Sequence, residues 1–159
     1  MKFCLIDQIK EVQPGDRISA VKCLTLAEEY LQDHFPRFPV MPGVLMLEAM
    51  TQTGAWLVRA TDNFAYSVTV LKEARNVKYA EFVEPGEILE VTAEFDKKEG
   101  NLTSLKVSGQ VAGKVAVSSR IVLESYNSSG GDEPNTTDRC AIRILKQQYD
   151  LLCRSWEKV

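Results

Sequence analysis

A predicted helix with apolar side chains on every side most constrains how this chain can fold. Pro42 and Gly43 mark its start, and the pattern continues to about Ala60. A helix that is apolar all round is a buried helix, so other parts of the chain must wrap it. Its apolar residues are Val44, Leu45, Met46, Leu47, Ala49, Met50, Ala55, Trp56, Leu57 and Val58.

Several segments rich in β-formers surround this helix in the sequence. Residues 17–26 come before it, and residues 27–33 form either one helical turn or a loop. Residues 97–101 (Lys-Lys-Glu-Gly-Asn) predict a hairpin loop. The strands predicted after the helix are 66–71, 74–79, 88–95, 102–111 and 115–123. This order predicts an α+β fold, in which a curved antiparallel sheet is wrapped around a long central helix.

The sequence divides into a domain, a linker and a terminal helix. We expect residues 1–126 to form the sheet-and-helix domain, residues 127–137 a flexible linker, and residues 138–159 an amphipathic helix with Asp138 as its N-cap. This last helix could pack on its own domain, on a second subunit or on another protein; mixed charges on its polar face disfavour a membrane surface. Its apolar residues are Ile142, Leu145, Tyr149, Leu152, Trp156 and Val159.

Composition limits the classes of function. The 159 residues are 45% apolar and 26% charged, which is typical of a globular protein. A net charge of -3 argues against nucleic-acid binding. No apolar run is long enough to span a bilayer and no secretory signal is apparent, so we expect a cytoplasmic location without membrane contact. The four cysteines form no CxxC pair and have no histidine nearby, which favours reduced thiols over a metal site.

A proline-rich turn joins the only histidine, His34, to Glu48 in the apolar helix. Histidine can act as a base near neutral pH. Desolvation disfavours a carboxylate, so Glu48 is expected to hold a proton that it can donate. Such a pair suits proton removal beside a carbonyl, coupled to loss of a β-hydroxyl. The free N–H of Gly43 could bind a thioester oxygen at the helix start. Purely structural roles for His34 and Glu48 are the alternative.

The motif that carries these residues resembles the signature of the (3R)-hydroxyacyl-ACP dehydratases of fatty acid synthesis, hot dog fold enzymes with a glutamate acid. The matching string is His34-Phe35-Pro36-x-x-Pro39-Val40-Met41-Pro42-Gly43-Val44-Leu45-x-x-Glu48-Ala49-Met50-x-Gln52. The likeness covers roughly residues 1–125, and the segment around Pro85-Gly86-Glu87 also resembles the family.

The resemblance implies an enzyme without cofactor or metal, whose substrate is carried by acyl carrier protein. His34 of one subunit would take the α-proton, and Glu48 of the other would protonate the departing hydroxyl. Gly43, Val44 and Gln52 would bind substrate. The subunits would form a homodimer, often extended to a trimer of dimers. A basic set (Arg59, Lys72, Arg75 and Lys78) could receive the acidic carrier or be ordinary solvated charge.

Two departures from the family pattern matter. Arg37 stands where the family often has glycine, which affects the entrance to the substrate tunnel. Glu48 stands where the dehydratase–isomerase branch carries aspartate, which argues against isomerisation.

The alternative functions are a hot dog acyl-thioesterase, which does not generally carry the His34-to-Glu48 arrangement, and a non-catalytic acyl-binding subunit. The terminal helix could cover a tunnel mouth, extend an interface or tether a partner.

Overall fold

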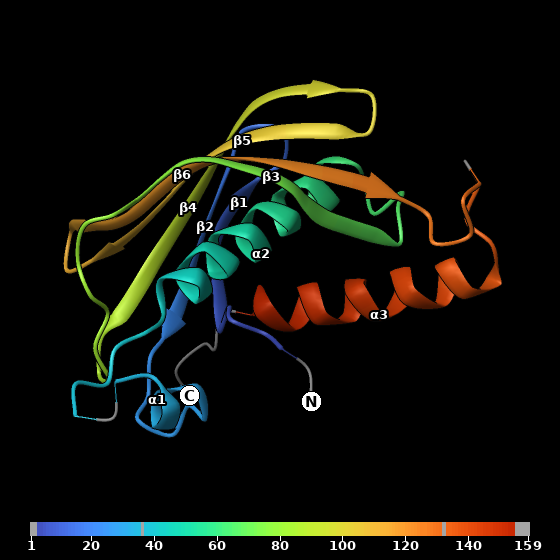
Figure 1. Ribbon diagram of the computed structural model, residues 1–159. Helices are drawn as coiled ribbons and strands as arrows, with labels where there is room; N and C mark the ends of the chain where they lie inside the picture. The colour runs from blue at the N-terminus through green and yellow to red at the C-terminus, as the bar shows by residue number, and fades with distance from the viewer. Residues whose placement is uncertain (1–2, 36, 132, 155–159) are drawn as a thin grey trace.

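One curved antiparallel sheet wraps around a central helix, α2 (Gly43–Thr61). The computed structural model describes residues 3–35, 37–131 and 133–154. Figure 1 shows α2 beneath the sheet and α3 (Thr136–Leu152) along the side of α2 that the sheet leaves open. The predicted α+β hot dog architecture is therefore confirmed. In the described part of the chain, no helix combines the length and the apolar character needed to cross a membrane.

The sheet has the order β1-β2-β4-β5-β6-β3, and every neighbouring pair is antiparallel. Strands β1 and β3 are its two edges. A short helix, α1 (Tyr30–Asp33), precedes the proline-rich turn. The strands are β1 (Gln8–Gln13), β2 (Arg17–Cys23), β3 (Val68–Tyr79), β4 (Ile88–Glu99), β5 (Leu102–Val111) and β6 (Lys114–Tyr126).

The strand predictions need three corrections. Segments 66–71 and 74–79 belong to one strand, β3, which accommodates the interruption through register shifts against β6. The hairpin loop is shorter than predicted, because Lys97 to Glu99 continue β4 and only Gly100 and Asn101 turn. Gly100 adopts a φ of 61°, which glycine tolerates without a steric penalty. Strand β1 lacks a clear alternating pattern and was not predicted.

Helix α2 approaches the sheet closely at Gly54. A Cβ atom there would lie 2.7 Å from Leu105 Cδ1, so a larger residue would force the Leu105 side chain to shift. The prediction that α2 is buried on every side is wrong for its first turn, where Val44 is 69% exposed. The sheet lies on one side of α2 and α3 on another, as Figure 1 shows, and Val44 is covered by neither in a single chain.

Helix α3 packs back on its own domain. The Tyr149 ring lies 5.9 Å from the Trp56 ring and 5.4 Å from the Phe64 ring, centroid to centroid. The helix begins at Thr136, two residues before the predicted start, and Asn135 is its N-cap in place of Asp138. Trp156 and Val159 of the predicted apolar stripe lie outside the described residues, as does Pro36.

Asp138 fastens the start of α3 to the sheet. Its buried carboxylate accepts hydrogen bonds from the hydroxyls of Ser67 (2.6 Å), Ser128 (2.7 Å) and Ser129 (2.6 Å). These hydrogen bonds, that of Ser129 above all, hold the pKa of Asp138 well below its usual value. The segment before α3, whose composition predicts a flexible linker, is thus tied through Asp138 to Ser67, the residue before β3.

Candidate active site

His34 follows α1 and lines a cavity of about 370 Å³. Its backbone N–H donates to the carbonyl of Tyr30 (3.2 Å), and its ring lies 4.4 Å from the ring of Phe35. The cavity wall is mostly apolar and includes Gly43, Met46, Tyr79 and Phe82. The turn therefore presents His34 to a mostly apolar hollow, whose wall also includes Glu81.

Gly43 opens α2 on the wall of the same cavity. The first N–H groups of an α-helix have no acceptor within the helix, and the positive end of its dipole lies there. A Cβ atom at this position would lie 2.9 Å from Cε1 of Tyr79, so the absent side chain lets the Tyr79 ring cover the helix start. His34 and the backbone of Gly43 thus face one space, as the sequence predicts.

Glu48 lies one turn further along α2 and lines a second cavity of about 380 Å³. Its side chain is half-buried in a single chain. The other walls of this cavity come from β3, through Thr69 to Leu71, and from α3, through Leu145 and Gln148. No described residue lines both cavities, so the structure does not bring His34 and Glu48 into one space within a chain.

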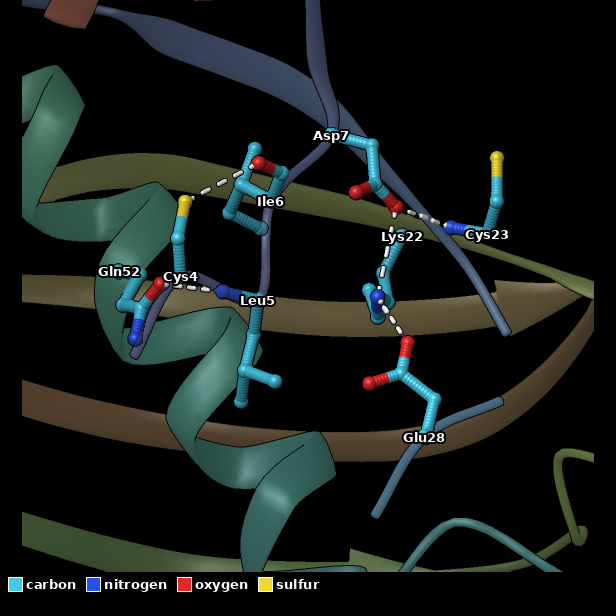
Figure 2. Close-up of polar contacts among 8 residues, drawn as sticks. All are labelled: Cys4, Leu5, Ile6, Asp7, Lys22, Cys23, Glu28 and Gln52. Atoms are coloured by element: carbon cyan, nitrogen blue, oxygen red, sulfur yellow. Dashed lines mark hydrogen bonds and ion pairs between the residues drawn. The ribbon is translucent and has the colours of Figure 1, made fainter. Parts of the chain in front are cut away.

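Gln52 holds Glu48 in place. Its Nε2 donates to Oε1 of Glu48 (2.8 Å) across one helical turn and to the backbone carbonyl of Phe3 (3.3 Å). Its Oε1 accepts the backbone N–H of Leu5 (2.9 Å), as Figure 2 shows. Because both atoms of the amide are engaged, Gln52 positions the carboxyl; its role in substrate binding stays a prediction.

A buried lysine secures the segment that holds Gln52. Lys22 on β2 is 5% exposed, and its Nζ lies 2.6 Å from Glu28 and 3.6 Å from Asp7 (Figure 2). Burial alone would lower its pKa, but Glu28 and Asp7 outweigh that effect and raise it. Asp7 follows the segment at Phe3 and Leu5, and Glu28 precedes α1. One cation therefore fixes both chain segments that lead to the site.

The predicted basic set is not a uniform exposed patch. Lys72 pairs with Glu124 (2.9 Å) and Arg75 with Glu73 (2.6 Å). Arg59 is half-buried and lines the cavity of Glu48, where sequence reasoning did not place it. Its position could have been read from the spacing, because residues 48, 52 and 59 repeat at intervals that share one helix face.

Polar groups in the described residues do not gather into a metal-ligand set. No three His, Cys, Asp or Glu side chains of residues 3–35, 37–131 and 133–154 are grouped so that they could hold an ion. The four cysteines are free thiols, and Cys23 and Cys140 are exposed.

Comparisons with known proteins agree with this fold and with the motif. A FabA-like domain is recognised over residues 1–120. The 3-hydroxyacyl-[acyl-carrier-protein] dehydratase FabZ of Levilactobacillus brevis is 34% identical over 118 residues, covering 74% of this chain and 80% of the relative. The FabZ of Oenococcus oeni is 36% identical over 119 residues, covering 75% of this chain and 86% of the relative.

Among solved structures, the dehydratase heterocomplex ApeI:P from Xenorhabdus doucetiae is similar with a TM-score of 0.63. Its sequence identity is 18%, and the match covers 89% of each chain, so this likeness concerns the fold alone. The FabA-like domain and the curated relatives carry the assignment. The chain therefore belongs to the FabA-like family and, within it, to the FabZ-type dehydratases.

Proposed function

We propose that this protein removes water from (3R)-hydroxyacyl groups on acyl carrier protein, giving trans-2-enoyl-ACP in fatty acid synthesis. The observation that carries the proposal is the division of the family's two motif residues between cavities. His34 and the Gly43 N–H line one, and Glu48, held by Gln52, lines the other. Each cavity holds half of an acid–base pair, so a complete site needs a second copy of the chain.

The second copy would come through β3. This strand is an edge of the sheet, 12 residues long, and its outer hydrogen-bonding groups are unpaired in the single chain. Long unpaired edges favour pairing with another strand. A two-fold β3–β3 contact would bury the same surface of both subunits. Such a contact would also cover Val44, which is exposed in the single chain. A homodimer, extended to a trimer of dimers, fits these features.

The reaction divides between three groups. His34 of one subunit takes the α-proton, while the N–H of Gly43 holds the thioester oxygen as it gains negative charge. The electrons of the broken C–H bond form the new double bond to the β-carbon. The bond from that carbon to oxygen breaks, and Glu48 of the partner protonates the hydroxyl so that it leaves as water. No metal or cofactor takes part.

Free, exposed thiols at Cys23 and Cys140 fit a reducing compartment such as the cytoplasm. The carrier protein is expected to dock where the His34 cavity opens, because the thioester must reach Gly43. Arg37, three residues after His34 in the sequence, is exposed and would supply positive charge for an acidic carrier.

The test is an assay of purified protein with 3-hydroxybutyryl-ACP. Dehydration creates a conjugated enoyl thioester, so the ultraviolet absorbance should rise with the wild type and stay flat with His34→Ala. Glu48→Gln should be equally inactive. Release of free thiol in place of the absorbance rise would identify a thioesterase, and binding without either product would identify an acyl-binding subunit. Thermal melting of each variant should confirm that it is folded.

A further inference from the structure

Arg59 has no role in the proposed reaction. It lies in the last turn of α2 and lines the same cavity as Glu48. Its Nε atom is buried without a hydrogen-bond partner. No ion pair or hydrogen bond joins its guanidinium to any residue in the described part of the chain. A buried polar N–H that lacks an acceptor is costly.

The contacts that Arg59 makes do not provide a hydrogen-bond acceptor. Its guanidinium stacks on Trp56, with Cζ 5.0 Å from the ring centroid, which fixes the plane of the group. A cation near a helix C-terminus also interacts favourably with the helix dipole. Neither contact supplies an acceptor for the N–H groups at the edge of the guanidinium. Burial lowers the pKa of Arg59 to about 10, so the group stays charged at neutral pH.

One acidic residue lies close by but forms no ion pair with Arg59. Asp62 lies three residues further along and lines a small crevice with Arg59; its Oδ1 pairs with Lys98, and its Oδ2 is buried without a hydrogen-bond partner. Apart from Glu48, no carboxylate among the described residues lines the larger cavity. On the facing helix α3, the cavity is lined by Leu145 and Gln148, and neighbouring Lys146 adds a second cation over Phe64. Among the described residues that line this cavity, Arg59 is the only charged one besides Glu48.

Glu48 and Arg59 lie on the same face of α2, at opposite ends of the cavity wall. Eleven residues separate them, which is three helical turns plus about 20°, and roughly 16 Å along the axis. Gln52 and Ala55 lie between them on the same stripe. The cavity thus runs from the proposed acid toward an unpartnered guanidinium.

The order of atoms in the substrate indicates which part of it would lie in the cavity lined by Arg59. The thioester is held at Gly43 and the β-hydroxyl at Glu48, so everything beyond the β-carbon continues past Glu48. The carrier arm lies on the opposite side of the thioester. The cavity lined by Arg59 therefore receives the far end of the acyl chain.

We propose that Arg59 binds a carboxylate at the far end of the acyl chain, so that this protein prefers ω-carboxyl 3-hydroxyacyl substrates to methyl-ended ones. This inference rests on the proposed function. A carboxylate would accept the N–H groups that the guanidinium presents, in the bidentate geometry that arginine favours. A methyl end would leave the buried Nε–H without an acceptor, which is the basis of discrimination.

The test compares 3-hydroxyacyl-ACP substrates of equal length that end in a methyl group, a carboxylate or its methyl ester. With the wild type, kcat/KM should be at least about tenfold higher for the carboxylate, because an unmet charged hydrogen bond costs that much or more. Arg59→Gln should remove this advantage and change the methyl-ended rate by less than about twofold. Arg143→Gln, an exposed charge change on α3, should match the wild type. An equal loss on all three substrates, or no preference in the wild type, would overturn the proposal.

A binding measurement separates this proposal from the reaction itself. Calorimetry with acyl-pantetheine thioesters that lack the hydroxyl needs no turnover, and these ligands carry no phosphate. Arg59→Gln should weaken the ω-carboxyl thioester about tenfold and leave the methyl-ended one unchanged. If the wild type binds them in this way but dehydrates nothing, the proposed reaction fails and the carboxylate site stands. The same measurement is repeated with phosphopantetheine thioesters, which do carry a phosphate. If Arg59→Gln weakens the binding of these ligands alone, Arg59 holds the phosphate of the carrier arm and the carboxylate site is excluded.

Discussion

Gln52 donates a hydrogen bond from Nε2 to Oε1 of Glu48, 2.8 Å away across one turn of α2. The same amide accepts the N–H of Leu5 through Oε1 (2.9 Å). Because the N-terminal segment fixes the amide and the amide fixes the carboxyl, the proposed acid is oriented by residues far away in the sequence.

Replacing Gln52 should therefore slow the reaction more than it weakens binding. In Gln52→Leu the Glu48 carboxyl loses the hydrogen bond that orients it. We expect kcat to fall about tenfold to a hundredfold, since small misplacement of a catalytic group is costly. KM should change little. Gln148→Leu is the matched control, because Gln148 lines the same cavity but bonds to Cys4 Sγ (3.6 Å). Steady-state kinetics decide: a rise in KM with unchanged kcat would show that Gln52 binds substrate and does not position the acid.

Gly43→Ala should impair the reaction without unfolding the protein. The added methyl would meet Cε1 of Tyr79 at 2.9 Å, but Tyr79 is 50% exposed and can move. The methyl also crowds the N–H proposed to hold the thioester oxygen, so kcat should fall about a hundredfold. Adding Tyr79→Ala removes the clash and should not restore activity. Restored activity in the double variant would mean that the displaced Tyr79 ring, and not the crowded N–H, caused the loss.

Lys22→Met should lower the free energy of unfolding by about 2 kcal/mol, because two carboxylates lose their partner. The pKa of Lys22 is raised above 10.5 in the folded state. Its stabilisation is therefore complete below pH 10.5 and is lost as the pH rises through the folded value. Urea unfolding at several pH values should show a constant difference from the wild type near neutrality and a shrinking one above pH 10.5. A difference that grows at high pH would contradict this assignment.

The docking of α3 should depend on the charge of Asp138. Hydrogen bonds from Ser129, Ser67 and Ser128 hold its pKa below the usual 3.8. The stabilisation is thus present above pH 3.8 and is lost as the pH falls through the folded value.

Asp138→Asn should weaken this anchor at neutral pH, because the amide cannot accept all of these hydrogen bonds. Hydrogen exchange across α3 should accelerate, and the fluorescence of Trp56 should change as Tyr149 leaves it. Asp150→Asn, at an exposed position of the same helix, is the control. Unchanged exchange in Asp138→Asn would show that the Tyr149 packing alone holds α3.

Local patterns predicted the elements well where each pattern is self-contained. Pro42 and Gly43 correctly mark the start of α2, and the alternation of residues 102–111 coincides with β5. The N-cap of α3 was misplaced because Asn135 and Asp138 cap each other, and either residue type suits the role.

The site could be predicted only in part from the sequence. The motif indicated His34, Gly43 and Glu48, but local periodicity carries no information on contacts such as that of Gln52 with Leu5, 47 residues away. For the same reason Arg59 was assigned to a surface patch, although packing against Trp56 draws it into the cavity. Only the three-dimensional packing shows that the proposed base and acid line different cavities.

The most direct test of the account mixes two inactive variants, His34→Ala and Glu48→Gln. If the proposed site spans two subunits, unfolding and refolding the variants together creates heterodimers with one intact site, and activity should return to about a quarter of the wild-type level. Each variant refolded alone should stay inactive. A mixture that remains inactive, although mass spectrometry shows that heterodimers have formed, would contradict a site built from His34 of one subunit and Glu48 of the other.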